Sequence, residues 1–111
     1  MARKSTPTMR DKLKSALDTT KLSFARYAWS RDHFPTGDYG VYAEDGENAL
    51  IADQTHTECS MRFTVDYFTR DDSDAIRTTI ETALDAFSWY LNSVQYEDDT
   101  GYIHYEWVVE V

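Results

Sequence analysis

A strict alternation of apolar and polar residues between Cys59 and Tyr67 constrains the fold more than any other feature of this sequence. Every odd position of this segment is apolar, and every even position is polar. Successive side chains of a strand point to opposite faces, so the pattern predicts a half-buried antiparallel strand with one face in water. Cys59 lies on the apolar face, where we interpret it as a packing residue.

Two segments have helical periodicity instead. Residues 1–20 contain an N-cap at Thr6 and a proline in the first turn, followed by an apolar stripe of Met9, Leu13, Ala16 and Leu17. Residues 71–87 open with an acidic run, which suits a helix N-terminus, and continue with a stripe of Ile76, Ile80, Ala83, Leu84 and Phe87. We therefore expect two amphipathic helices.

The other segments are predicted as strands. Bulky residues favour a strand over 21–29, and the dipeptide Asp45-Gly46 is typical of a tight hairpin turn. The expected pairings are Tyr39–Glu44 with Asn48–Ala52 in a first hairpin, and Trp89–Glu97 with Tyr102–Val111 in a C-terminal hairpin across 98–101.

The element order predicts one α+β domain over residues 1–111: an antiparallel sheet with two amphipathic helices packed on one face. Its parts are the basic N-terminal helix (1–20), the strands and first hairpin (21–70), the second helix (71–87) and the C-terminal β-hairpin (88–111).

Composition excludes several classes of protein. A chain of 111 residues with 41% hydrophobic residues suffices for one core and is not typical of disorder. No apolar run reaches the length of a membrane span, and the basic N-terminus has no apolar stretch behind it, so we expect no signal peptide and a cytoplasmic location. A single cysteine excludes an internal disulfide framework.

Charge is distributed unevenly along the chain. Residues 1–31 hold eight bases and two acids, a net charge of +6, whereas residues 32–111 hold three bases and 18 acids, a net charge of −15. The acidic part repels nucleic acid phosphates. The basic N-terminal element favours complementary-charge association between neighbouring copies, and a merely solvated charged surface remains the alternative.

No motif for catalysis or metal binding emerges. His104 and Glu106 share one face of a predicted strand, and with Glu110 they could form part of a metal or acid–base cluster. Because nothing in the sequence fixes a further ligand or catalytic partner, a solvated polar face is the simpler interpretation. His56 and Cys59 point to opposite faces of a strand, and His33 lies in a loop. The acidic groups near residues 44–47 and 97–99 lack the spacing of a calcium loop. We expect no enzyme activity, no cofactor and no metal.

Aromatic residues crowd the C-terminal hairpin, where Tyr96, Tyr102, Tyr105 and Trp107 follow closely on one another. Exposed aromatic residues are enriched at protein interfaces, so this group could form part of an interface. Pairing of aromatic side chains across strands of the sheet is the alternative, and the sequence leaves both interpretations open. The candidate interface residues are Arg3, Lys4, Arg10, Lys14, Tyr96 and Tyr102.

Two segments resemble small minor-capsid or tail-component proteins of tailed phages and prophages of Gram-positive bacteria. They are Tyr39–Asn48 (YGVYAEDGEN) and Leu91–Trp107 (LNSVQYEDDTGYIHYEW). The sequence is similar to this family over most of residues 20–111, and within it the chain resembles the tail terminator, or tail completion, proteins of long non-contractile tails.

The resemblance implies a structural role in the virion. Such a protein forms a hexameric ring that caps the tail tube and offers a head–tail joining surface, with the tail tube protein and a head-closure protein as partners. DNA would pass through the ring without specific binding, and Glu44, Asp45 and Glu47 are our candidates for an acidic, lumen-facing loop. The alternatives are another neck component and a small acidic inhibitor that imitates DNA.

Overall fold

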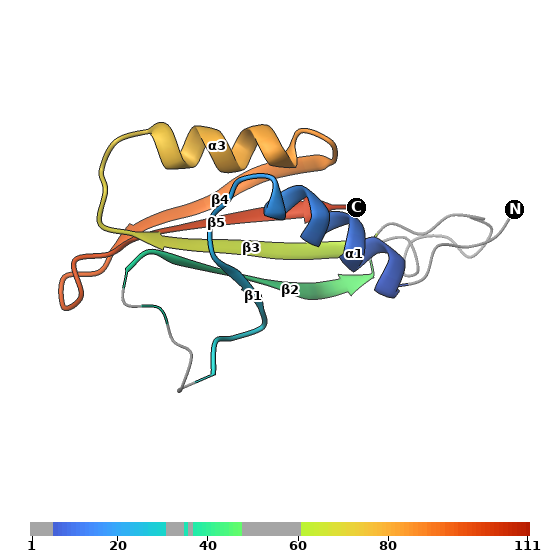
Figure 1. Cartoon of the computed structure of the whole chain (residues 1–111), viewed down its shortest axis with the longest axis horizontal. Coiled ribbons are helices and arrows are strands. Elements are labelled where there is room, and N and C mark those ends of the chain that lie inside the picture. The colour runs from blue at the N-terminus through green and yellow to red at the C-terminus, as the bar shows by residue number, and fades with distance from the viewer. Residues whose placement is uncertain (1–5, 31–34, 36, 48–60) are drawn as a thin grey trace, which may run out of the picture.

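A computed structural model describes residues 6–30, 35, 37–47 and 61–111 (Figure 1). The elements follow one another as α1 (Thr6–Asp18), β1 (Phe24–Arg26), β2 (Tyr39–Glu47), β3 (Met61–Thr69), α3 (Ala75–Leu84), β4 (Ser88–Tyr96) and β5 (Ile103–Glu110). The five strands form one sheet in the order β1-β2-β3-β5-β4. The α+β class is confirmed.

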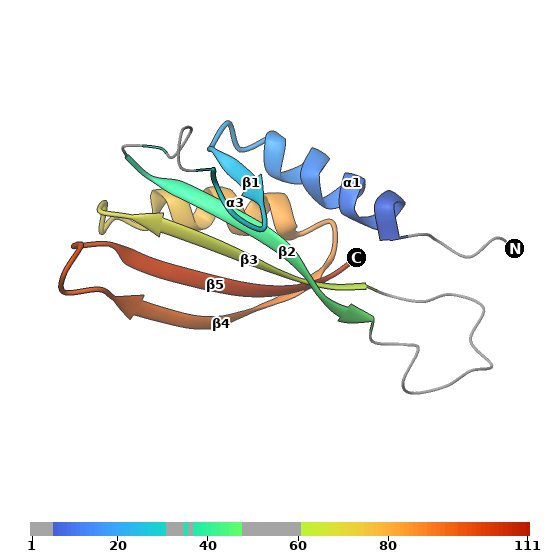
Figure 2. The ribbon, with the colours of Figure 1, turned by 90° about the horizontal axis from the view of Figure 1, so that it is seen from below.

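Both helices lie on the same side of the sheet (Figure 2). The predicted stripes supply the buried helical residues, which are Met9, Leu13 and Leu17 of α1 and Ile80 and Leu84 of α3. On the sheet, the alternation of β3 is confirmed because its odd positions from Met61 to Thr69 are all buried. Burial of these aligned apolar faces is the main contribution to the stability of the domain.

The C-terminal hairpin is also confirmed. β4 and β5 pair antiparallel from Ser88 opposite Glu110 to Tyr96 opposite Ile103, with an irregularity between Leu91 and Ser93. In the turn, Gly101 has a φ of +78°, a conformation that glycine adopts without strain.

The predicted first hairpin is wrong. Asp45 and Gly46 lie inside β2, which continues to Glu47 and pairs with β3. The register shifts between Glu44 and Glu47, so the pair that favours a turn lies at an irregularity of the ladder. The predicted partner segment, 48–52, lies outside the described residues, as do His33, His56 and Cys59.

The sheet is mixed rather than antiparallel, because β1 pairs with β2 in parallel. The strand predicted over 21–29 is also shorter, and spans only Phe24–Arg26. Lys21 and Tyr27, which flank it, have φ values of 64° and 67°, outside the range of a regular strand. The second helix is likewise shorter than 71–87: Asp74 stands at its N-cap without a side-chain capping bond.

Neither helix of the described part of the chain is long and apolar enough to cross a bilayer.

Candidate interaction surfaces

The sheet face that the helices leave open carries an aromatic cluster near one end. The rings of Tyr39, Phe68 and His104 stack in sequence, with centroids 4.6 and 4.1 Å apart. Tyr102 meets Tyr39 edge-on at 5.6 Å, and the Arg70 guanidinium lies 4.0 Å from the Tyr102 ring centroid. These contacts fix the end of the sheet beside the β4–β5 turn.

Tyr102, one of the predicted interface residues, packs inside its own subunit. It is 8% exposed, and its hydroxyl donates a hydrogen bond to the Gly37 carbonyl at 2.9 Å. Tyr96 is by contrast 66% exposed. Tyr96 is therefore accessible for contact with another subunit, whereas Tyr102 contacts residues of its own subunit.

His104 pairs with a residue that sequence reasoning did not connect to it. Its Nε2 lies 2.9 Å from Oδ2 of Asp66 on the neighbouring strand β3. The hydrogen bond to Asp66 raises the pKa of His104 and outweighs the opposing effect of burial. Glu106, which the strand pattern placed beside His104, instead accepts a hydrogen bond from Asn92 Nδ2 at 2.7 Å. The alternation of β3 placed Asp66 on the wet face, but its strand partner could not be predicted locally.

Glu44, a predicted lumen residue, is at the centre of a compact polar cluster. It is paired with Arg26 at 2.8 Å and lies 3.9 Å from Arg10, and the Tyr27 hydroxyl donates a hydrogen bond to it. Burial alone would raise the pKa of Glu44, but hydrogen bonds from Tyr27, its own backbone and Arg26 outweigh it and lower that pKa. The cluster joins α1, β1 and β2.

The other two members of the predicted acidic loop differ. Asp45 is half-exposed and pairs with Arg62 at 3.3 Å, and the side chain of Glu47 lies outside the described residues. That these three residues face a lumen stays a prediction.

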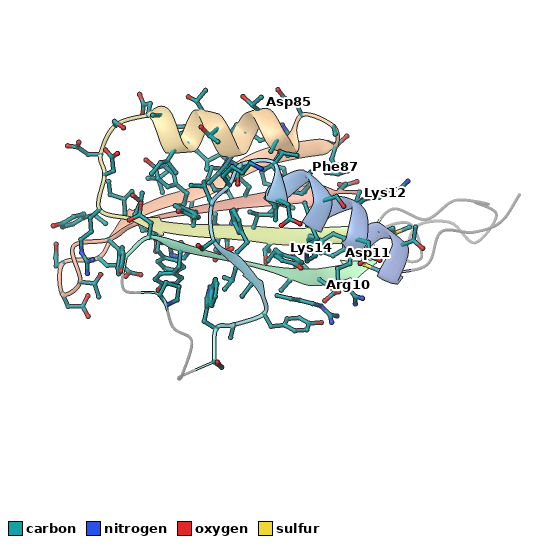
Figure 3. All side chains as sticks on the ribbon, in the orientation of Figure 1. Arg10, Asp11, Lys12, Lys14, Asp85 and Phe87 are labelled. Carbon is teal, nitrogen blue, oxygen red and sulfur yellow. The ribbon has the colours of Figure 1, made fainter. Side chains whose placement is uncertain are left out.

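The described bases of the N-terminal region lie on α1, on β1 and in the turn between them, and Lys12 lies beside Ser88 and Glu110 rather than at the β1 edge. These bases are Arg10, Lys12, Lys14, Lys21 and Arg26, against Asp11 and Asp18. Figure 3 shows Arg10 and Lys14 on the side of α1 that faces β2, with Lys12 on the side facing Phe87. Lys14 pairs with Asp18 at 3.1 Å. Arg3 and Lys4 lie outside the described residues.

The opposite edge strand, β4, is uncharged, but the turns before and after it hold Asp85 and Glu97–Asp99. From residue 78 to the end, the sequence contains seven acids and no Lys or Arg, and this region forms most of α3 together with β4 and β5. β1 and β4 are the two edge strands. Part of the unequal charge along the sequence is therefore found near the two edges, as Lys21 and Arg26 at β1 and as the acidic turns that flank β4.

A shallow groove runs between α1 and the turn after α3. Its lining includes Ala16, Ala86 and Phe87 together with Asp11 and Lys12, and Figure 3 labels Asp11, Lys12 and Phe87. The lining contains no His or Cys, and within the described ranges no three His, Cys, Asp or Glu residues are grouped to hold a metal ion.

No family model matches the sequence, and no curated protein matches it. Among solved structures, the chain is similar to a PVC sheath/tube terminator of an extracellular contractile injection system in its extended state, with a TM-score of 0.47 and 8% identity. The similarity covers 100% of this chain, which spans 57% of the length of that protein. A similarity at this level concerns the course of the chain only.

Proposed function

We propose that this protein is a structural component of a tailed-phage particle that caps the tail tube as an oligomeric ring and offers the surface on which the head joins. The observation that carries the proposal is a difference in charge near the two sheet edges: Lys21 and Arg26 lie at the β1 edge, whereas the turns that flank the β4 edge hold Asp85 and Glu97–Asp99. A subunit whose opposite sides are complementary associates head to tail, and such heterologous contacts close into rings when the rotation permits.

The two segments that carry the resemblance to phage tail proteins support the same proposal. Tyr39–Asn48 includes all of β2, and Leu91–Trp107 includes most of the β4–β5 hairpin. Both belong to the sheet and its outer edge rather than to a pocket. A structural role depends on such surfaces, whereas an enzyme depends on convergent polar groups in a cavity.

The finer assignments belong to this proposal as well. The ring is a homohexamer in the virion at the head–tail junction, assembled in the host cytoplasm, and its neighbours are the tail tube protein and a head-closure protein. Acidic residues of the 44–47 segment face the lumen, where they repel the DNA that slides through. No catalysis and no cofactor take part.

The test is electron microscopy of particles from a phage or prophage in which the reading frame is deleted in frame. We expect full heads beside detached, overlong tails, because an uncapped tube continues to polymerise. Filled heads with detached tails of normal length would move the protein to a joining role in the neck. Normal joined virions would refute a structural role.

A further inference from the structure

The edge strand β4 lacks the usual protection of an exposed sheet edge. None of its nine residues, Ser88–Tyr96, is charged, and none is proline, although 28% of the chain is Asp, Glu, Lys or Arg. Natural proteins place charges or proline on long edge strands to prevent pairing with another chain. The irregularity between Leu91 and Ser93 is the one such device found in this strand.

Exposed apolar side chains concentrate at the same edge. Among the described residues, four large hydrophobic side chains are exposed, and three of them are Tyr90, Val94 and Tyr96 of β4, at 55%, 49% and 66%. Tyr90 is opposite Val108 on the open face, while Val94 and Tyr96 are opposite Tyr105 and Ile103 on the helix side. The edge therefore presents apolar groups on both faces.

The fourth exposed side chain is Tyr27, at 57%, directly after the opposite edge strand β1. The Arg26 guanidinium lies 4.5 Å from its ring centroid. Both edges thus present exposed aromatic side chains; Arg26 accompanies Tyr27 at the β1 edge, whereas the uncharged β4 is followed by the acidic turn Glu97–Asp99.

We propose that the β4 edge of one copy docks antiparallel against the α1–β1 edge of the next copy. This inference rests on the ring proposed above and names its subunit contact. The strand directions support it: β1 runs with β2, and each later neighbour in the order β2-β3-β5-β4 is antiparallel, so β1 and β4 run in opposite directions. Copies placed side by side with the same face up bring these edges together as antiparallel neighbours.

The charges at the strand ends match this arrangement. The acidic turn Glu97–Asp99 follows β4, and in an antiparallel contact it lies beside the segment that precedes the neighbour's β1, where Lys21 is exposed. A two-fold contact between two β4 strands would instead bring Asp85 of each copy towards Asp98 and Asp99 of the other. Like charges disfavour that alternative, so the contact is heterologous.

The first test is chemical cross-linking of the full chain. In a Cys59→Ser background, Ser23→Cys and Val94→Cys place one thiol beside each edge, and a short bismaleimide is added. We expect a ladder of covalent multimers from the double variant, while each single variant gives at most a dimer. A matched control pairs Ser23→Cys with Ser88→Cys, an exposed residue at the other end of β4. A ladder no stronger than that of the control would overturn the proposal. So would a Val94→Cys single variant that cross-links to a dimer as efficiently as the double variant forms multimers, because that result indicates a two-fold contact between β4 strands.

Charge variants test the same contact independently. Asp98→Lys with Asp99→Lys should lower the yield of multimers at least tenfold in the cross-linking background, and adding Lys21→Glu should restore part of it. Arg77→Glu, on α3, where Arg77 pairs with Glu81 at 3.1 Å, should restore nothing. Equal rescue by both would refute the pairing of these ends. If the ladder forms but the deletion mutant makes normal virions, the contact between copies is supported and the role in the tail is refuted. If no ladder forms but the deletion mutant makes detached, overlong tails, only the proposed contact is refuted.

Discussion

Substitution of Gly40 by alanine should loosen β1 from the rest of the sheet. A Cβ at this position would lie 2.5 Å from Phe24 Cδ1 and 2.8 Å from Tyr67 Cδ1, whereas unstrained carbon contacts are about 3.5–4.0 Å. Tyr67 is 1% exposed and has no space to move, so the displacement must fall on the half-buried Phe24 in its three-residue strand.

The magnitude follows from two opposing effects. Overpacking of this kind typically destabilises by about 1–3 kcal/mol, and the lower entropy of an unfolded chain with alanine returns about 0.4–1 kcal/mol. We therefore expect Gly40→Ala to lower the free energy of unfolding by about 1–2 kcal/mol. Urea denaturation followed by tryptophan fluorescence measures it, since a domain of this size commonly unfolds in two states.

Gly37→Ala is the matched control. A Cβ at Gly37 meets no atom within 4 Å, and the backbone there is not left-handed, so its stability should be unchanged or slightly higher. In a Phe24→Leu background, the loss from Gly40→Ala should become smaller, because the clashing ring is gone. The reasoning is refuted if Gly40→Ala costs no more than Gly37→Ala, or if its cost is the same with leucine at position 24.

Three further substitutions test the core and the polar face. Trp107→Phe removes a fully buried indole whose Nε1 donates to Glu81 at 3.0 Å, and should lower the free energy of unfolding by roughly 1–3 kcal/mol in urea; no change would contradict the packing. Because the hydrogen bond to Asp66 raises the pKa of His104 above 6.5, the stability that this pair contributes should be fully present below pH 6.5 and should be lost as pH rises through the raised pKa. The urea midpoint of His104→Gln should lack this pH dependence. Burial, with a smaller effect of Asp38, raises the pKa of Tyr67 to about 12. The free energy of unfolding should therefore fall by roughly 2–3 kcal/mol as pH rises from ~10 to ~12. Denaturation curves of Tyr67→Phe should lack this alkaline loss.

Local patterns predicted the elements that depend on local rules. The alternation of β3, the two helical stripes and the C-terminal hairpin all follow from side-chain period and turn residues, and each lies where the sequence put it to within a few residues. Burial then selects one face of each element, so the composition of the core could also be predicted.

Non-local pairing explains the errors. Asp45-Gly46 favours a tight turn, but pairing of β2 with β3 extends the strand through that dipeptide, because the ladder and the buried face outweigh a local preference. The parallel pairing of β1 with β2 leaves no local periodicity to detect. The His104–Asp66 pair joins residues 38 positions apart, and it depends on the register between β3 and β5.

The separation of charge could be counted in the sequence, but its consequence depends on the strand order. If the C-terminal hairpin had joined the sheet beside β1, the acids of 78–111 would have faced the bases of α1 and β1 within one molecule. Instead β2 and β3 lie between β1 and that hairpin, so the uncharged strand β4, with acidic turns before and after it, forms the opposite edge. Glu44 neutralises part of the basic edge through Arg26 and Arg10, yet Lys21 and the exposed ring of Tyr27 remain at the surface there. The contact that we propose between copies would bring Lys21 together with the acidic turn Glu97–Asp99.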